Sequence, residues 1–433
     1  MTYLLYGVGA VALIMLSYIA APRLMTVEYG ADVALVRTAR EADTEPEQDT
    51  PPPPDTRPVI DHVPLPMPVK AAYMTACVAG THDFRDRVVT LVADTELNTL
   101  IIDIKDYSGT ISFPPQSDEW KPAWDAAKCG TADMQQFIAA LHEKGIFVIG
   151  RITVFQDPFY APLHPELAVK KADGTTVWRD HKGLSFIDVG SRPYWDHLVM
   201  LARDAYTIGF DELNFDYVRY PSDGNMTDIA FTQSKHYEGD VDKQANLEEF
   251  FRYLNSKLDD ESLFAAVRHE NTGRASSTPW TSADLFGMTT TNYDDLSIGQ
   301  VQDRAAPYFD FIAPMVYPSH YPKNAFGYAN PNDYPYQIVY YAMHVGVSRM
   351  QSTTTPMMGF EHTRIGTSTP ALYAKPTFGP EKFRTWIQDF DYGGDYDAAD
   401  VRAQIQASED AGVMSYMIWA PSNIYTQGAL HAE

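Results

Sequence analysis

The sequence predicts an α/β protein, a (β/α)8 TIM barrel preceded by an N-terminal transmembrane anchor and a disordered linker. Beyond residue 70, short β-rich runs alternate with amphipathic helical stretches about eight times, which is the pattern of repeated βα units. The predicted strands from the second to the eighth end in polar or aromatic residues, as barrel strands do where their carboxyl ends form a mouth. The first 70 residues lack this alternation altogether.

The composition allows one large core and disfavours some partners. The chain has 433 residues, of which 45% are hydrophobic and 13% aromatic. One barrel with insertions accounts for most of this length, and several ordinary domains are the other option. The net charge of −24 disfavours nucleic acid and anionic membranes, because phosphate binding depends on clustered Lys and Arg.

Residues 1–22 are predicted to be a transmembrane anchor or a signal segment. Tyr3–Ala21 is uncharged and mostly apolar. As a helix it would be about 29 Å long at roughly 1.5 Å per residue, close to the hydrocarbon thickness of a bilayer. We expect an uncleaved anchor, although Tyr18–Pro22 leaves cleavage and secretion open.

Residues 23–70 are predicted to be a linker and residues 71–433 the barrel domain. The linker is rich in acids and prolines, with Pro51–Pro54 consecutive, so it buries too little apolar surface to fold. The anchor would place the barrel outside the cytoplasm, at the membrane.

Eight strands are expected in the barrel domain, with the fifth split in two. Their ranges are Ala72–Ala79, Thr99–Lys105, Ile146–Phe155, a strand within Gly209–Pro221, Phe264–Val267 with Ala283–Thr290, Phe309–Tyr317, Phe383–Phe390 and Val413–Ala420. Helices are expected over Phe84–Thr95, up to Lys144, over Pro193–Ile208 and Leu247–Leu258, and near Val339, with an insertion at Thr353–Pro380.

Cysteines and histidines indicate no metal site. Cys77 and Cys129 allow one bridge between the first strand and the loop after the second, but two buried thiols are the preferred interpretation. The sequence contains no metal-type spacing, no His-Glu-x-x-His and no phosphate-binding glycine loop. No metal or organic cofactor is therefore expected.

The fourth strand carries the most informative motif, GFDELNFDYVRYP over Gly209–Pro221. Its apolar residues alternate with Asn214 and Asp216, so the amide and the carboxylate share the face opposite the apolar one. Arg219 follows before the terminating proline. We expect Asp216 to point into the barrel mouth.

Three carboxylates are candidates for catalysis. A barrel mouth with several carboxylates, two arginines and aromatic walls suits glycoside chemistry. Hydrolysis of a glycosidic bond needs two carboxyl groups, roughly 5 Å apart for retention or about 6.5 to 9.5 Å apart for inversion, one of them with a raised pKa. Asp216 is the predicted nucleophile or base, ionised by Arg219 or Arg151, although a purely structural ion pair would use the same residues. Asp284 is the predicted acid unless it caps a turn, and Asp389 competes for that role.

Further polar and aromatic residues at the strand ends are candidates for substrate binding. Asp103 and Lys105 could instead pair with each other, and the aromatic residues could be ordinary packing. The candidates are Asp103, Lys105, Arg151, Asn214, Arg219, Tyr317, His320, Gln388, Trp419 and Asn423.

Several long segments, among them GFDELNFDYVRYPSDG, IIDIKDYSG, SADLFGMTTT, FIAPMVYPSHY, RTWIQDF and WAPSNIY, together resemble one family over about Ala72–Tyr425. This is the glycoside-hydrolase-like barrel family formerly catalogued as a domain of unknown function. The resemblance implies a (β/α)8 barrel with a glycosidase-like site. It places Asp216 and Arg219 in the strand-four motif, Asp284 in the strand-five motif, and Gln388 with Asp389 in the strand-seven motif.

The sequence therefore predicts a glycosidase that acts on an extracytoplasmic polysaccharide with two carboxylates. A barrel that binds glycan at the cell surface without cleaving it is the alternative. An enzyme that removes acyl groups from polysaccharide is disfavoured, because neither a Gly-x-Ser-x-Gly elbow nor a metal-ligand cluster is present.

Overall fold

The computed structural model describes residues 55–432, of which residues from Arg57 onward belong to one compact unit. The predicted membrane segment Tyr3–Ala21 lies outside the described residues. Within residues 55–432, no helix is both long enough and apolar enough to cross a bilayer.

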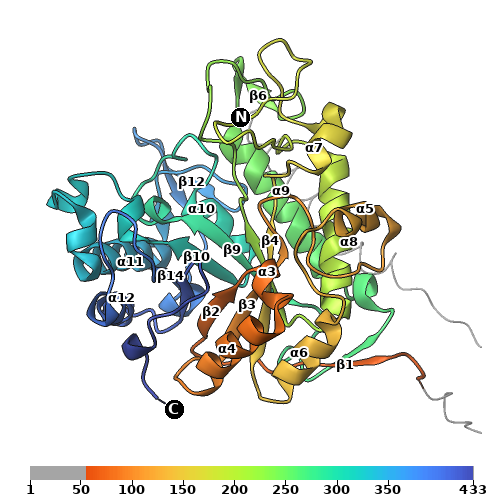
Figure 1. Ribbon diagram of the computed structural model, residues 1–433. Coiled ribbons are helices and arrows are strands. Elements are labelled where there is room, and N and C mark those ends of the chain that lie inside the picture. Colours follow the sequence, from red (N-terminus) through yellow and green to blue (C-terminus); the bar gives the residue numbers. More distant parts are fainter. Residues whose placement is uncertain (1–54, 433) are drawn as a thin grey trace, which may run out of the picture. The chain divides into compact units, whose positions relative to one another are not determined.

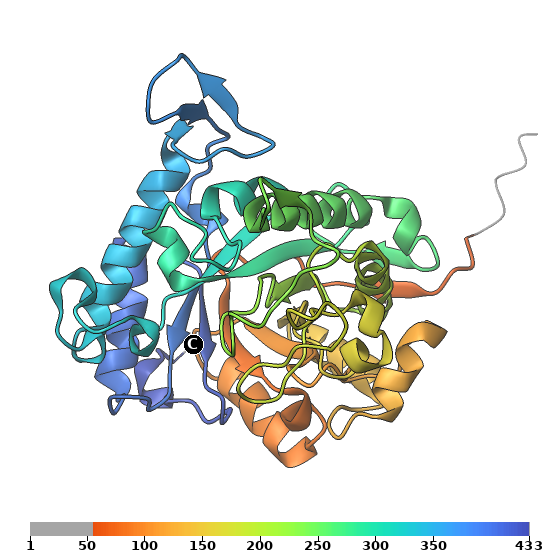
Figure 2. The ribbon, with the colours of Figure 1, turned by 90° about the horizontal axis from the view of Figure 1, so that it is seen from above.

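Eight parallel strands close into a barrel, which confirms the barrel part of the predicted fold (Figures 1 and 2). The strands follow chain order around the barrel, β2-β3-β4-β5-β9-β10-β14-β15, and β15 pairs with β2. They are β2 (Lys70–Met74), β3 (Thr99–Lys105), β4 (Phe147–Thr153), β5 (Glu212–Asp216), β9 (Trp280–Phe286), β10 (Phe311–Met315), β14 (Thr385–Gln388) and β15 (Tyr416–Trp419).

Most helices cover the outside of this barrel (Figure 2). The helices are α3 (Ala76–Ala79), α4 (His82–Ala93), α5 (Lys121–Asp125), α6 (Met134–His142), α7 (Tyr160–Leu163), α8 (Arg192–Thr207), α9 (Lys243–Leu258), α10 (Gln302–Ala305), α11 (Pro335–Gln351) and α12 (Ala398–Asp410). Local chemistry sets several ends. A proline opens α8, Gly209 follows its end with φ 116°, and Asp397 with Asp400 forms a capping box at α12.

The first and fifth strands differ from their predicted ranges. The predicted first strand ends early, because Thr75 accepts from Val78 N at 3.2 Å and caps α3. The predicted segment Phe264–Val267 does not enter the barrel, and the fifth strand is β9 alone. The residues after β9 form the 3-10 helix Gly287–Thr290.

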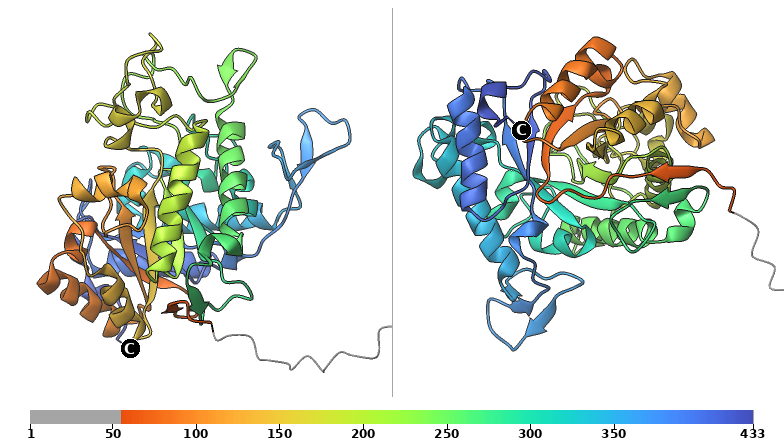
Figure 3. Two further views of the ribbon diagram at one scale, coloured as in Figure 1. Left: turned by 90° about the vertical axis from the view of Figure 1, so that its right-hand side faces the viewer. Right: turned by 90° about the horizontal axis from the view of Figure 1, so that it is seen from below.

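Residues 59–62, near the end of the predicted linker, pair with the barrel domain. The sequence analysis placed residues up to 70 in the linker, whereas β1 (Val59–Asp61) pairs with β8 (Arg268–Glu270). His62 follows and is buried, with its Nδ1 2.9 Å from Asp211 Oδ1. β1 lies at the end of the barrel opposite α7 and the hairpin of β6 (His236–Tyr237) and β7 (Asp240–Val241) (Figures 1 and 3).

The predicted insertion Thr353–Pro380 contains a small antiparallel sheet in the order β11-β13-β12. Its strands are β11 (Thr354–Thr355), β12 (Thr363–Ile365) and β13 (Leu372–Ala374). The sheet projects from the barrel beyond α11 (Figures 2 and 3). None of its residues lines either of the two hollows described below.

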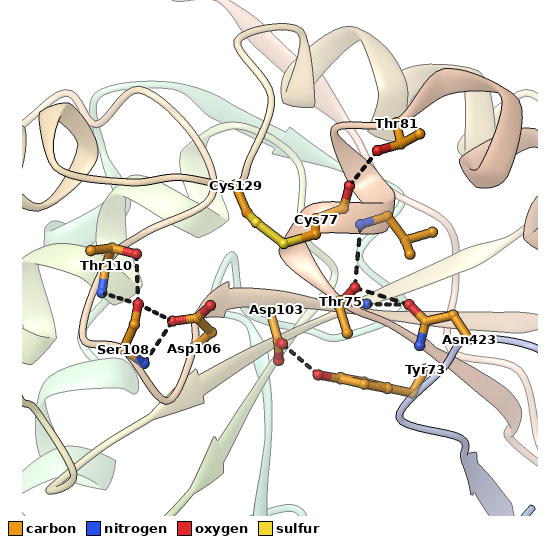
Figure 4. The surroundings of a disulfide bond; sticks show 11 residues. Tyr73, Thr75, Cys77, Thr81, Asp103, Asp106, Ser108, Thr110, Cys129 and Asn423 are labelled. Carbon is orange, nitrogen blue, oxygen red and sulfur yellow. Dashed lines mark hydrogen bonds between the residues drawn. A yellow bond between two sulfur atoms is a disulfide. The ribbon is translucent and has the colours of Figure 1, made fainter. Parts of the chain in front are cut away.

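Cys77 and Cys129 form a disulfide, so the expectation of two buried thiols is wrong (Figure 4). Their Cα atoms lie 4.4 Å apart, and the bridge spans 52 residues of sequence. Because α3 replaces the end of the predicted first strand, Cys77 lies at the surface instead of in the sheet.

The barrel interior contains an apolar cluster and a column of polar side chains. The apolar side chains come from β2, β3, β4, β10, β14 and β15. In the polar column, the buried Glu212 pairs with the buried Arg384 at 2.5 Å and accepts from Ser282 Oγ at 2.6 Å. Asn214 donates to Ser282 Oγ at 2.9 Å, so a polar column leads up β5 and β9 to the mouth.

Candidate active site

One arginine joins three carboxyl groups at the mouth of the barrel. Arg151 on β4 donates from Nη1 to Asp103 Oδ1 on β3 at 2.7 Å, and from Nη2 to Asp216 Oδ2 on β5. Its Nε lies 3.8 Å from Asp284 Oδ2 on β9. Burial opposes the guanidinium charge, but the nearby carboxylates, Asp216 first, raise the pKa of Arg151 well above its usual value. Arg151 therefore stays charged and gathers groups from three neighbouring strands.

Asp284 is a buried carboxyl group with two different oxygens. Its Oδ1 accepts from Trp386 Nε1 at 2.7 Å and from Asn214 Nδ2 at 2.9 Å. Its Oδ2 is buried and has no hydrogen-bond partner. Burial and the negative charge of Asp216 raise the pKa of Asp284 well above its usual value. A proton held on Oδ2 would be free to be donated.

The strand and the backbone N–H of the next residue orient the Asp216 carboxylate. Leu213 and Phe215 face the helices and belong to the outer core, while Asp216 faces the mouth, as the alternation in the sequence predicts. Tyr217 N donates to Asp216 Oδ1 at 2.5 Å. Tyr217 has a φ of 52°, which is strained for a bulky residue and typical of functional sites.

Asp103 supports the arginine from the other side. It accepts from Tyr73 OH at 2.5 Å (Figure 4). It also accepts from Arg151. Burial raises the pKa of Asp103 to about 6, against the opposing effects of Arg151 and Tyr73. Burial and Asp103 together raise the pKa of Tyr73 well above its usual value, so the phenol stays neutral and donates.

These groups form the floor of a hollow of about 220 Å³, the central pocket, walled by aromatic side chains. Its lining residues are Tyr73, Arg151, Asp216, Tyr217, Arg219, Asp284, Phe286, Met315, Tyr317, His320, Trp386 and Trp419. Apolar walls over a few convergent polar groups are typical of a small-molecule site. Aromatic faces above carboxyl groups also suit a sugar ring.

A second and larger hollow of about 930 Å³, the outer hollow, shares His320 and Trp419 with the central pocket. Its remaining lining residues are Lys182, Ser319, Asp389, Phe390, Asp391, Tyr392, Tyr396, Pro421, Ser422, Ile424 and Thr426. Most of them come from the loops that follow β14 and β15.

The structure brings most of the predicted site residues together. Asp216, Asp284, Arg151, Arg219, Tyr317, His320 and Trp419 line the central pocket, and Asp103 and Asn214 hydrogen-bond to them. Of the two arginines considered as the partner of Asp216, Arg151 makes the pair. Arg219 donates instead to Tyr220 O and Ser222 Oγ, both at 3.1 Å.

The pairing of Asp103 with Lys105 does not form. The pairing register shifts between these two residues, so they do not face the same way despite their spacing of two. Lys105 is buried, lies 3.1 Å from Asp157, and donates to Thr153 O at 2.7 Å. Lys105 therefore holds the loop after β4 and does not line the central pocket.

Three predicted residues at the ends of β14 and β15 hold loops. Gln388 donates to Phe390 O at 2.9 Å, and Asn423 Oδ1 accepts from Thr75 N at 2.9 Å. Asp389 accepts from Thr426 N at 2.8 Å and from Thr426 Oγ1 at 2.7 Å. Asp389 lines the outer hollow and not the central pocket.

Five residues of the central pocket are absent from the sequence prediction. They are Tyr73, Tyr217, Phe286, Met315 and Trp386. A usable signal existed for Trp386, which shares its strand face with Gln388, two residues on. Tyr73 was missed because the predicted first strand ran past its true end and hid which residues reach the mouth.

Metal ligands do not gather at this site. Within residues 55–432, no group of three or more His, Cys, Asp or Glu side chains is arranged to hold a metal ion.

A profile of the family described as "Putative glycosyl hydrolase domain" matches residues 71–425. Comparison with the curated proteins gives no match. A hypothetical protein from Ruminiclostridium thermocellum is 27% identical over 46% of this chain and 95% of its own, with a TM-score of 0.38.

Two further solved structures share the fold at low sequence identity. The PgaB (BpsB) glycoside hydrolase domain from Bordetella bronchiseptica is 13% identical, with a TM-score of 0.52 over 85% of this chain and 95% of its own. Alpha-L-fucosidase isoenzyme 2 from Paenibacillus thiaminolyticus is 12% identical, with a TM-score of 0.51 over 84% of this chain and 48% of its own.

The raised pKa of Asp103 predicts a measurable effect on stability. Because the folded pKa of about 6 lies above the ordinary aspartate value of 3.8, the folded state binds the proton more tightly, and stability falls as pH rises between these values. We expect Asp103→Asn to remove this loss. Relative to the variant, the wild type should lose about 2 kcal/mol of unfolding free energy from pH 4 to pH 7.

Urea unfolding of both proteins across this pH range measures the difference. Asp294→Asn is the control, because Asp294 is exposed in a loop and its side chain accepts from Leu296 N at 3.2 Å. If the difference in unfolding free energy between wild type and Asp103→Asn stays constant across this pH range, Asp103 does not titrate within it.

Proposed function

The chain belongs to the putative glycosyl hydrolase domain family, and from this premise we propose that it hydrolyses glycosidic bonds in an extracytoplasmic polysaccharide. Asp284 acts as the acid and Asp216 as the nucleophile or base. The observation that carries the proposal is the pair of carboxyl groups on one guanidinium, one of which has a buried oxygen free of hydrogen bonds.

The two carboxyl groups differ in the way that the reaction requires. Both Asp284 hydrogen bonds are accepted by Oδ1, so a proton on Oδ2 competes with none of them. Transfer of this proton to the glycosidic oxygen lets the leaving sugar depart as a neutral alcohol. Asp284 is then a carboxylate beside Arg151, whose charge compensates the one that has developed.

Asp216 acts as the nucleophile or the base. Arg151 and the backbone N–H of Tyr217 hold one oxygen each, so the carboxylate is oriented before a substrate arrives. It either attacks the anomeric carbon or takes a proton from the attacking water. Arg151, Asp103 and Tyr73 position these groups and exchange no proton with the substrate.

The aromatic walls support a sugar as the occupant of the central pocket. The Tyr317 and Trp419 rings lie 5.1 Å apart, and Trp386 closes another wall while donating to Asp284. Such faces bind the C–H surfaces of a sugar ring and exclude water from the carboxyl groups.

Location outside the cytoplasm is part of the proposal. The Cys77–Cys129 disulfide supports it, because such bridges persist in oxidising compartments and are rare in the cytosol. The apolar segment Tyr3–Ala21, which the sequence predicts to be an anchor or signal, agrees with this placement.

Asp216→Asn should abolish turnover while the protein stays folded. The amide keeps the shape of the side chain but cannot act as nucleophile or base. Release of reducing ends from a panel of polysaccharides, and of p-nitrophenol from a panel of glycosides, measures activity. Asp294→Asn should retain wild-type rates. Full activity in Asp216→Asn would sink the assignment, and glycan binding by the wild type without any release would favour the non-catalytic alternative.

Asp284→Asn should lower kcat by about 10² to 10⁴ on natural glycosides, whose leaving groups need a proton. The loss should be smaller on p-nitrophenyl glycosides, because p-nitrophenolate leaves unprotonated. The wild-type kcat/KM should fall as pH rises through the raised pKa of Asp284, and the variant should lack this decline.

Asp389→Asn separates the two candidates for the acid. Asp389 hydrogen-bonds Thr426 with both oxygens, so its variant should keep the wild-type ratio of rates on natural and p-nitrophenyl substrates. If this variant, instead of Asp284→Asn, lost the alkaline decline, Asp389 would be the acid.

The disulfide should be intact in the protein taken from its native compartment. Acid-quenched cells treated with a maleimide reagent should label neither Cys77 nor Cys129 until a reductant is added. Replacing both cysteines by serine should lower the unfolding free energy by about 2 to 4 kcal/mol. Labelling without reduction would contradict the proposed location.

A further inference from the structure

We propose that the outer hollow binds the part of the glycan chain that continues beyond the sugar held in the central pocket, which makes the protein selective for polymers over short glycosides. This inference rests on the proposed function for the identity of the ligand. It assigns a binding site, formed by the loops after β14 and β15, that catalysis itself does not require.

The two hollows adjoin each other. His320 and Trp419 line both, and the Trp419 ring lies 4.9 Å from the ring of Phe390 in the outer hollow. A chain leaving the central pocket past Trp419 therefore meets Phe390 next. Tyr392 follows on the same loop, with its ring 6.2 Å from that of His320.

The sizes of the hollows suit different lengths of ligand. The central pocket, of about 220 Å³, is smaller than the roughly 300 to 1,000 Å³ of sites for drug-sized molecules and suits one sugar ring. The outer hollow, of about 930 Å³, lies near the top of this range. It has room for several linked sugars.

The walls of the outer hollow leave apolar surface in solvent. Tyr392 is 65% exposed and Ile424 is 71% exposed, although both are large and apolar. They stand on the loops after β14 and β15 respectively, so they line the hollow from two different strands. Apolar faces bounded by Lys182 and Asp391 match the alternating C–H and hydroxyl surfaces of a glycan.

Hydrogen bonds hold these loops before any ligand arrives. Both oxygens of Asp389 accept from Thr426, which ties the loop after β14 to the loop after β15. Asp391 Oδ1 accepts from Tyr396 N at 2.8 Å, and Tyr396 OH donates to Asn332 at 3.2 Å. The lining is therefore organised in advance, which reduces the entropy lost on binding.

The test compares short and long substrates of the same sugar. Tyr392→Ala and Ile424→Ala should each lower kcat/KM on a long oligosaccharide about tenfold, mainly through KM, because an aromatic or apolar contact is lost. Both variants should keep wild-type rates on the glycosyl fluoride of the same sugar, because its leaving group is a single atom and it fills only the central pocket. Tyr237→Ala, at an exposed tyrosine on β6, is the control and should change neither rate.

Equal kcat/KM of variant and wild type on the long substrate would overturn the proposal. An equal loss of kcat/KM on the short and the long substrate would overturn it too. A rise in kcat with no change in KM would also contradict it.

A binding measurement tests this inference independently of the proposed hydrolysis. In affinity electrophoresis through gels containing hydroxyethyl cellulose, laminarin, glycol chitin or polygalacturonate, the Asp216→Asn protein should be retarded by at least one polymer. Adding Tyr392→Ala should remove most of the retardation, even if the wild type hydrolyses nothing and the proposed function fails. Retardation that survives Tyr392→Ala, or no retardation by any polymer, would overturn the inference.

Discussion

The arrangement at the barrel mouth depends on the guanidinium group of Arg151. Three carboxyl groups from β3, β5 and β9 lie around it, and without a positive charge their mutual repulsion and burial would be unfavourable. Arg151 orients Asp216 directly and is itself held by Asp103, which Tyr73 supports in turn. The positive charge of Arg151 thus offsets the repulsion among the three buried carboxyl groups and fixes their positions.

The barrel explains why Asp284 can differ chemically from Asp216. Asp284 is the top of a buried polar column that begins at the Glu212–Arg384 pair and continues through Ser282 and Asn214. The column satisfies Oδ1 from within the barrel and leaves Oδ2 without a partner. Glu212 needs Arg384 beneath it because an unpaired carboxylate would be costly at that depth.

Local sequence patterns predicted the elements whose form depends on nearest neighbours. The alternation around Asn214 and Asp216 correctly assigned which face of β5 points into the barrel, and the TLIIDIK run has the bounds of β3. The same reasoning failed where a single residue ended or interrupted a strand. Thr75 begins a helix, which moved Cys77 to the surface, and an irregularity in β3 turned Lys105 away from Asp103.

By itself, the sequence determined that the chain forms repeated βα units and which strand ends carry carboxyl groups, because both depend on residues close together in the chain. Only the tertiary structure decided which side chains pair with one another. Arg151, rather than the nearer Arg219, pairs with Asp216, because neighbouring strands place side chains 65 residues apart within hydrogen-bonding distance. It also decided that Asp389 holds a loop while Asp284 retains a free oxygen, since burial and hydrogen-bond partners are set by contacts between distant strands.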